Sequence, residues 1–310
     1  LLFDSVRGNT SMTDKFLVSN ATSAEGANGV TGTTVTVNAD GMQIVESSID
    51  SGELYFNSRT YVMWNWLAST AFSNDASATG VGTIDSEGRV NTTAGFSIIK
   101  YSGSNSAASF AHGLSAAPEF LIIKQRTTTG NWVVAADVPN WTWSSDYLLL
   151  ESSAAKATNG GSSLFTSAPS STVVNIGGGS LTSTAGQDLI CYAFHSVEGY
   201  SKIGSYLGNG NANGPFIYTG FRPAWIMIKQ SSAAGQWWGI LDRARDPGNL
   251  MQQRLWANAT NAESTYSTDE YDFLSNGFKL KGSYASINAS GSTYIYLAFA
   301  QSPFKFANAR

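Results

Sequence analysis

Two histidines and one cysteine are the residues of this 310-residue chain best suited to act as bases, nucleophiles or metal ligands. His112 lies in "FAHGLSAAPEF", while His195 and Cys191 lie in the apolar run "DLICYAFHS". A catalytic triad needs a histidine beside an acid and a hydroxyl or thiol, and a zinc site needs several ligands close together. His112 is separated from the other two, so we expect no catalytic residue, no metal site and no cofactor. We expect Cys191 to be a buried, inert thiol.

Exposed aromatic side chains beside amides are the next candidates, because indole rings stack on sugars. Asn140, Trp141 and Trp143 lie together in "DVPNWTWSSDY", and Trp256 and Trp238 are further tryptophans of the same kind. We therefore take Asn140, Trp141, Trp143 and Trp256 as candidate ligand-binding residues. The alternative is that the two indoles of the loop plug it onto its own domain.

The composition limits the class of protein. Only 13% of the residues are charged and the formal net charge is −4, with the basic residues scattered singly. Binding to nucleic acid needs clustered Lys and Arg, so we expect no nucleic-acid partner. No apolar stretch reaches the ~20 residues of a membrane helix, so we expect no membrane insertion.

The chain contains a repeat that positions all these residues. The segment "PEFLIIKQRTTTGNWVVAAD" from Pro118 returns as "PAWIMIKQSSAAGQWWGILD" from Pro223, 105 residues later. At this offset Trp132 matches Trp237, and both are expected in the core. In the later copy, His112 and His195 are matched by Thr219 and Ala300. The absence of a histidine there argues against a catalytic role for either one.

An incomplete copy precedes these two. Asp4, Arg7 and Glu25 match Asp242, Arg245 and Glu263 at an offset of 238 residues. We interpret the recurring Asp and Arg as a structural pair that fixes a loop. Further along, Trp66 aligns with Phe194 and Phe299, so it is also expected in the core.

These matches divide the chain into a first unit (1–68, incomplete), a second unit (95–198) and a third unit (199–310, with a C-terminal tail). Short apolar runs between Gly-, Ser- and Asn-rich turns predict an all-β protein of tandem β-sandwich-like, jelly-roll-like units. The polar, Gly-rich residues 69–94 are interpreted as a linker or arm.

The first unit lacks the counterpart of the "KQ…WWGI" hairpin, about 40 residues by alignment. A sandwich without these strands would expose strand edges. We expect the strands to lie upstream of this sequence, or to be donated by another subunit through strand exchange.

Three strings carry a resemblance to a known kind of protein. "NTTAGFSIIKYSGSNSAASFAHGLSAAPEFLIIKQRTTTGNWVV", "RTYVMWNWLA" and "YIYLAFAQSPFKFANAR" resemble a repeated domain in virion proteins of tailed, often marine, bacteriophages. The resemblance implies a particle component rather than an enzyme, and it supplies no catalytic residues.

On this basis we expect a tail fibre or appendage protein on the virion surface, serving assembly and host attachment. Its partners would be other virion proteins and a host glycan or protein, and by analogy it would form a homotrimer. A capsid decoration protein is the alternative within this class. A carbohydrate-binding module or glycan-processing enzyme is the alternative from another class, although the carboxylate pair of a glycosidase is not distinguishable.

Overall fold

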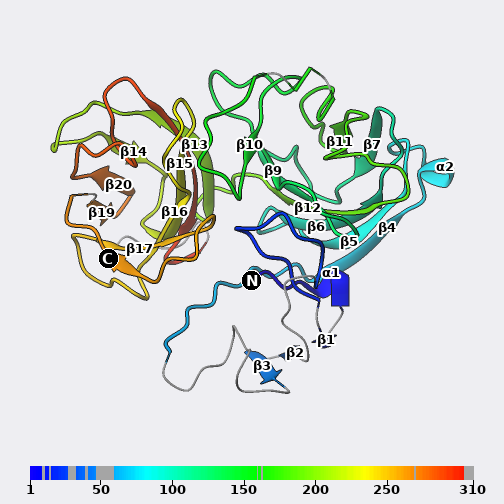
Figure 1. Ribbon diagram of the computed structural model, residues 1–310, viewed down its shortest axis with the longest axis horizontal. Coiled ribbons are helices and arrows are strands. Elements are labelled where there is room, and N and C mark those ends of the chain that lie inside the picture. The colour runs from blue at the N-terminus through cyan, green and yellow to red at the C-terminus, as the bar shows by residue number, and fades with distance from the viewer. Residues whose placement is uncertain are drawn as a thin grey trace.

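The computed structural model describes residues 1–8, 11–13, 15–26, 33–38, 41–46, 59–158, 160–161, 163–268 and 270–303. The described part of the chain consists of strands and turns, with two one-turn helices, α1 (Ser5–Gly8) and α2 (Ala76–Thr79). The predicted all-β, sandwich-like class is therefore confirmed. Figure 1 shows the second and third units as two lobes side by side, with α1 below the lobe of the second unit.

The second unit is built on a seven-stranded antiparallel sheet. Its strand order is β10 (Leu148–Leu149), β9 (Val133–Ala136), β8 (Phe120–Gln125), β12 (Asp188–Phe194), β6 (Phe96–Ser102), β5 (Ser86–Asn91) and β4 (Thr70–Asn74). The prediction that residues 69–94 are a linker or arm is wrong. They form the edge strand β4, helix α2 and strand β5. Their polar composition fits a sheet edge whose alternate side chains face solvent.

The third unit repeats the centre of this arrangement. Its sheet has the order β13 (Ser201–Leu207), β21 (Thr293–Ala300), β15 (Pro223–Gln230), β16 (Gly239–Asp242), β17 (Gln253–Trp256) and β18 (Ser264–Thr265). The central order β13-β21-β15-β16 corresponds to β6-β12-β8-β9. The register also corresponds, since Ile190 pairs with Lys124 and Ile295 pairs with Lys229, both shifted by 105 residues.

A small sheet covers the outer face of each large one. β7 (Ala108–Ala111) and β11 (Val173–Ile176) cover the second unit. β14 (Phe216–Tyr218), β20 (Gly277–Leu280) and β19 (Tyr271–Leu274) cover the third. Because both faces of the large sheets are buried, their central strands are continuously apolar instead of alternating.

The inner faces of the two large sheets share one core. Phe120, Ile190 and Phe194 from the second unit and Trp225 and Phe299 from the third belong to the same buried cluster. The alternate residues of the same strands point the other way and face the outer cores, as the two-residue period of a strand requires. The two units are thus joined by a hydrophobic core and not only by a chain connection.

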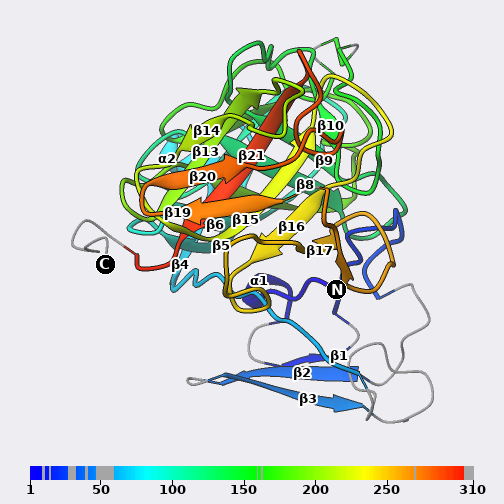
Figure 2. The same ribbon diagram turned by 90° about the vertical axis from the view of Figure 1, so that its left-hand side faces the viewer.

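The first unit adds a smaller set of elements to this frame. β1 (Ser11–Thr13), β2 (Thr33–Asn38) and β3 (Gly41–Glu46) form an antiparallel sheet that lies apart from the rest in Figure 2. A single bridge joins Leu2 to Leu17, at the offset of 238 from the Ile240–Leu255 pair of β16 and β17. Residues 61–68 run extended, with Trp64 and Trp66 against the shared core.

One predicted core position is wrong by one residue. The segment between β15 and β16 is one residue longer than that between β8 and β9. As a result Trp238, which is 1% exposed, takes the place of the fully buried Trp132, and Trp237 is 36% exposed. The pairing confirms this shift, because Val133 faces Ile123 while Gly239 faces Ile228.

Candidate interaction site

The recurring Asp and Arg form the same structure in the first and third units. Asp4 Oδ1 accepts the amides of Val6 and Arg7, and Asp4 Oδ2 accepts Arg7 Nε at 2.5 Å. Asp242 holds the amides of residues 244 and 245 and accepts Arg245 Nε at 2.6 Å. The carboxylate therefore caps a turn and fixes the guanidinium beside it.

The rest of each guanidinium also bonds at matching positions. Arg7 Nη2 donates to the carbonyl of Leu2 at 2.8 Å, and Arg245 Nη2 donates to that of Ile240 at 3.1 Å. Nη1 approaches Glu25 at 3.6 Å in the first unit, and its counterpart bonds Glu263 at 2.5 Å in the third. These Asp–Arg–Glu groups are occupied by the fold and present no unpaired charge for catalysis.

Contacts between units are made by a hairpin of one unit and a loop of the unit before it. We call residues 18–25, 149–156 and 256–263 the first, second and third docking loops. The indole Nε1 of Trp132, at the start of β9, donates to the carbonyl of Val18 at 3.0 Å. Trp238, at the start of β16, donates to the carbonyl of Leu149 at 3.0 Å. Both acceptors open their docking loops, so the second unit binds the first as the third binds the second.

A buried lysine strengthens each of these contacts. Lys124 and Lys229 are fully buried in β8 and β15. Lys124 Nζ donates to the carbonyl of Thr22 at 3.2 Å, and Lys229 Nζ donates to that of Ser153 at 3.3 Å. Burial lowers the pKa of each ammonium to about 8, because removal from water disfavours the charged form.

The same two carbonyls each receive a backbone amide. Gly130 N donates to Thr22 O, and Gly235 N to Ser153 O, both at 2.9 Å. Near the other end of the docking loops, the amide of Glu25 donates to Arg126 O at 2.8 Å. The amide of Lys156 donates to Ser231 O at 2.7 Å. The two interfaces thus share a ladder of main-chain bonds that is independent of most side chains.

A further pair of contacts closes the arrangement into a ring. Tyr192 of the second unit donates to Asp4 Oδ2 of the first at 2.7 Å. Trp64 of the first unit donates its indole N–H to Asp242 Oδ2 of the third at 3.0 Å. Since the third unit also binds the second, each unit contacts the other two.

The aligned aromatic residues of the three units meet at the centre. The ring of Phe299 lies 6.1 Å from that of Phe194 and 5.5 Å from that of Trp66, measured between centroids. All three pack in or against the shared core. The three aligned aromatic residues therefore lie in one core at the centre of the ring, where the ring of Trp225 also contacts Trp66 and Phe299.

The candidate ligand-binding residues differ in how far the structure exposes them. Trp143 is 7% exposed, packs edge-on against Phe165 and donates to Asp137 Oδ1, so it cannot offer a sugar-binding face. Trp141 is half-buried against two cores, with the ammonium of Lys156 5.5 Å from its ring. Asn140 is exposed, but its carbonyl holds the same ammonium at 2.7 Å. The loop is plugged onto its own unit by Trp143, which is the alternative interpretation above.

The exposed aromatic cluster lies instead at the third docking loop. Trp256 stands between Trp237 and Tyr266, with centroid distances of 5.2 and 5.6 Å and nearly perpendicular planes. The guanidinium of Arg254 lies over Trp256 and Tyr266 at 5.2 and 5.1 Å. Trp238, the fourth candidate tryptophan, is buried in the contact between units. Of the candidates, Trp256 alone belongs to a partly exposed group of rings.

The histidines and the cysteine are held inside the second unit. His112 is fully buried, its Nδ1 accepts the amide of Leu114 at 3.1 Å, and its Nε2 lies 3.2 Å from Ser170 O. Burial lowers the pKa of His112 to about 4. Cys191 is also fully buried, and burial raises the pKa of its thiol. His195 bonds the carbonyl of Ser196 at 2.9 Å.

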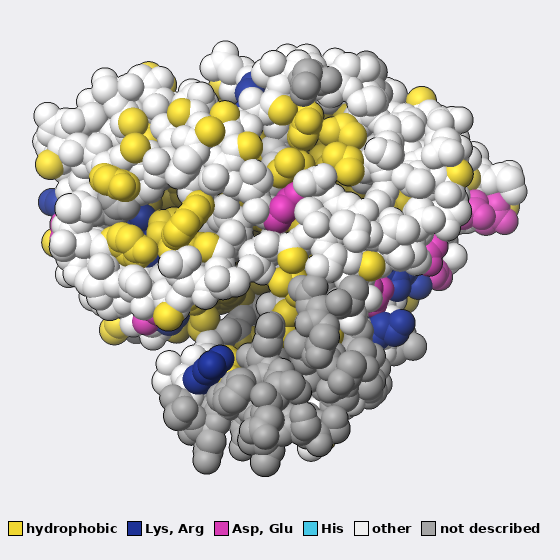
Figure 3. All heavy atoms as spheres, in the orientation of Figure 1, with side chains coloured by type: hydrophobic (Ala, Val, Ile, Leu, Met, Phe, Trp, Pro, Cys, Tyr) yellow, Lys and Arg dark blue, Asp and Glu magenta, His cyan; other side chains and the backbone are white. Residues whose placement is uncertain are grey.

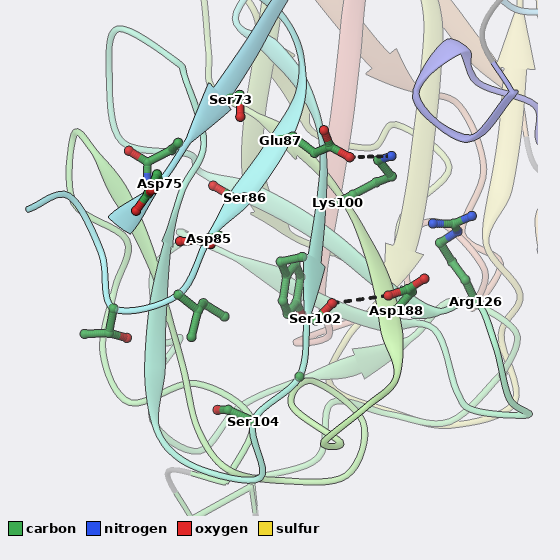
Figure 4. Close-up of a pocket in the computed structure, with 15 residues that line it drawn as sticks. Ser73, Asp75, Asp85, Ser86, Glu87, Lys100, Ser102, Ser104, Arg126 and Asp188 are labelled. Atoms are coloured by element: carbon green, nitrogen blue, oxygen red, sulfur yellow. Dashed lines mark hydrogen bonds and ion pairs between the residues drawn. The ribbon is translucent and has the colours of Figure 1, made fainter. Parts of the chain in front are cut away.

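An open polar groove of about 690 Å³ lies on the large sheet of the second unit, where β4, β5 and β6 run side by side (Figure 4). Its ionic groups are paired with each other or with neighbours. Lys100 bonds Glu87 at 2.6 Å, Arg126 bonds Glu25 at 2.8 Å, and Asp188 accepts the hydroxyl of Ser102 at 3.2 Å. Such cross-strand pairs are typical of a solvated sheet face, and the groove therefore has the character of a surface and not of a reaction centre.

The molecular surface agrees with the sparse charge of the sequence. On the face shown in Figure 3, Lys and Arg side chains are few and separate, and apolar side chains gather in patches over both lobes. Among the described residues no helix has the length and apolarity needed to cross a membrane.

Sequence reasoning did not assign a role to Lys124, Lys229, Tyr192 or Trp64. The lysines could have been found, since a charge recurring inside the apolar runs "FLIIKQ" and "WIMIKQ" indicates a buried ammonium with fixed partners. Tyr192 and Trp64 bond residues 188 and 178 positions away, and no local pattern marks such contacts.

The fold and its contacts define an all-β protein of interlocked β units. The chain belongs to the family described as domain of unknown function DUF7483, whose model matches residues 1–303. Neither a curated protein nor a solved structure matches the chain.

Proposed function

We propose that this protein is a non-enzymatic structural component of a bacteriophage particle, built into a tail fibre or another appendage, where it serves assembly and host attachment. The sequence resemblance to virion proteins supports the identity of the particle. The observation that carries a structural role is the repeated interlock of Trp132 with Val18 and of Trp238 with Leu149.

The interlock suits a rigid external part. Each of the two docking-loop contacts combines an indole bond, a buried lysine and main-chain bonds, and both tryptophans belong to one shared core. Because one core spans the units, local opening of either lobe costs burial in both. A particle surface that must persist outside cells needs this kind of cooperativity.

Attachment would use the cluster of Trp237, Trp256 and Tyr266. These partly exposed rings, at edge-to-face angles, offer apolar faces for a host glycan or protein. The same feature supports the second candidate function, a carbohydrate-binding module, because it requires only the aromatic surface.

The first experiment locates the protein in intact phage particles by immunogold electron microscopy. Label along a tail fibre or other tail appendage is the expected result. Label on the head would assign the protein to capsid decoration, and absence from purified particles would overturn the proposal. Polysaccharide turnover that disappears on changing one carboxylate would also overturn it.

The second experiment measures binding on a glycan array for the unaltered chain, Trp237→Ala and Trp141→Ala. If the cluster is the attachment surface, binding is lost in Trp237→Ala and kept in Trp141→Ala, whose ring lies outside the cluster. Binding by the chain in isolation, with no label on particles, would favour the carbohydrate-binding module.

A further inference from the structure

Each unit contributes one docking loop to the ring, but described residues fill only two of the three. The second unit's hairpin β8–β9 binds the first docking loop, and the third unit's hairpin β15–β16 binds the second. The third docking loop stands at the matching place, with Trp256, Thr260 and Glu263 at the positions of Val18, Thr22 and Glu25.

The main-chain groups used in the filled loops have no partner among the described residues in the third one. In the filled loops, Thr22 O and Ser153 O each accept a lysine and a glycine amide. Thr260 and Glu263 are exposed, and no described residue bonds to the carbonyl of Thr260 or accepts the amide of Glu263. The third loop therefore presents the acceptor and donor of a docking contact without the hairpin.

A second vacancy lies on the first unit. Residues 62–66 align with the central strands β12 and β21, each of which is paired with a strand on both sides. No described strand pairs with residues 62–66, and Met63 and Leu67 are 51% and 71% exposed. The corresponding positions of β21, Tyr296 and Ala300, are buried or half-buried.

One hairpin would fill both vacancies. β8 pairs with β12 while its lysine and the following tryptophan reach the preceding docking loop, and β15 does the same beside β21. The contact from Trp64 to Asp242 already places residues 62–66 against the third unit, as the contact from Tyr192 to Asp4 places β12 against the first. A strand paired with 62–66 would thus lead its hairpin to the third docking loop.

We propose that residues 62–66 and the third docking loop together bind a β-hairpin carried by a polypeptide segment outside residues 1–310. Its first strand carries a lysine whose ammonium bonds the carbonyl of Thr260. A main-chain carbonyl of its turn accepts the amide of Glu263. Its second strand begins with a tryptophan whose indole N–H donates to the carbonyl of Trp256. This inference concerns completion of the ring and does not depend on the virion proposal.

The test adds a synthetic peptide of residues 223–242, which contains a hairpin of this chemistry, to the full chain. Binding is followed by fluorescence anisotropy of the labelled peptide, and the site is located by hydrogen exchange. We expect saturable one-to-one binding that slows amide exchange at residues 62–66 and at Glu263.

Two matched pairs of variants distinguish this specific contact from nonspecific binding. In the peptide, Trp238→Phe should weaken binding about tenfold through the lost indole bond, whereas Trp237→Phe should not. In the chain, Glu263→Ala keeps the amide donor and should bind, whereas Glu263→Pro removes that donor and should bind about tenfold more weakly.

Several results would overturn the inference. They are an absence of saturable binding, equal affinity for the Trp238→Phe and Trp237→Phe peptides, and protection elsewhere on the chain. Self-association of the chain that already protects residues 62–66 would assign the hairpin to a second copy by strand exchange, and would also contradict the proposed occupant.

Discussion

The hydroxyl of Tyr192 donates to Oδ2 of Asp4 at 2.7 Å, although 188 residues separate the two in sequence. The same oxygen accepts Arg7 Nε, so one carboxylate both caps a turn of the first unit and binds the second unit to it. The first unit, which has few strands of its own in the frame, is held by contacts of this type.

Replacement of Tyr192 by Phe tests the strength of this link. The loss of a buried hydrogen bond to a carboxylate should lower the free energy of unfolding by about 1–2 kcal/mol. Because the bond holds the first unit, amide exchange should accelerate mostly in residues 2–7. Tyr218→Phe removes the same hydroxyl from a 66% exposed ring and is the control, with an expected change near zero. Equal effects of the two variants would show that the link is not stabilising.

The neighbouring tryptophans 237 and 238 allow a comparison within one turn. Trp238→Phe leaves the partly buried carbonyl of Leu149 without its donor and leaves unfilled volume in the core, which should cost about 2–4 kcal/mol. Trp237→Phe changes an exposed ring and should stay within about 0.5 kcal/mol. Urea unfolding at equilibrium measures both. The reverse order would restore the correspondence of Trp237, instead of Trp238, with Trp132.

This comparison also shows where sequence was sufficient and where it was not. The strand-rich class and the two complete units follow from apolar runs and from the offset of 105, which the paired lysines keep in the structure. The offset fails at Trp237 because a turn can gain one residue without disturbing the strands it joins, and a one-residue slip moves a side chain to the other face.

The interpretation of residues 69–94 as a linker failed for a different reason. β4 and β5 form the exposed side of a sheet, so their sequence needs few apolar residues. The docking contacts could not be predicted from their acceptors, since these are main-chain carbonyls, which every residue has. Only the buried lysines signal them, through their cost when unpaired.

The buried lysines predict an unusual alkaline dependence of stability. Burial lowers the pKa of Lys124 and Lys229 to about 8, below the value of about 10.4 for an unfolded chain. Between these values the unfolded chain binds more protons, so the free energy of unfolding should rise as pH increases from 8 to 10.5. The gain is complete above the unfolded pKa and is lost as pH falls through 8.

Urea titrations of the unaltered chain, Lys124→Met and Lys229→Met across this range measure that contribution. Each methionine keeps most of the side-chain length without the titrating group, so each variant should reduce the slope of stability with pH. Lys202→Met, on an exposed position of β13, is the matched control and should leave the slope unchanged. An unchanged slope in both core variants would mean that the two ammonium groups keep their ordinary pKa.

His112 predicts a loss of stability at acidic pH. The ring is fully buried, and the amide of Leu114 donates to Nδ1, which requires that nitrogen to be unprotonated. Nε2 then carries the proton and donates to the carbonyl of Ser170. Burial lowers the pKa of His112 to about 4, so between pH 6.5 and 4 the unfolded chain binds more protons than the folded one.

The stabilising contribution of neutral His112 is therefore complete above pH 6.5 and is lost as pH falls through 4. A depression of this size corresponds to about 2–3 kcal/mol at pH 4. His112→Gln keeps an amide donor but cannot be protonated, so its free energy of unfolding should fall less between pH 6.5 and 4 than that of the unaltered chain. His195→Gln is the matched variant and should retain the full loss due to His112. If His112→Gln lost as much stability in acid as the unaltered chain, protonation of His112 would not be what destabilises the fold, because the remaining carboxylates titrate in both proteins alike.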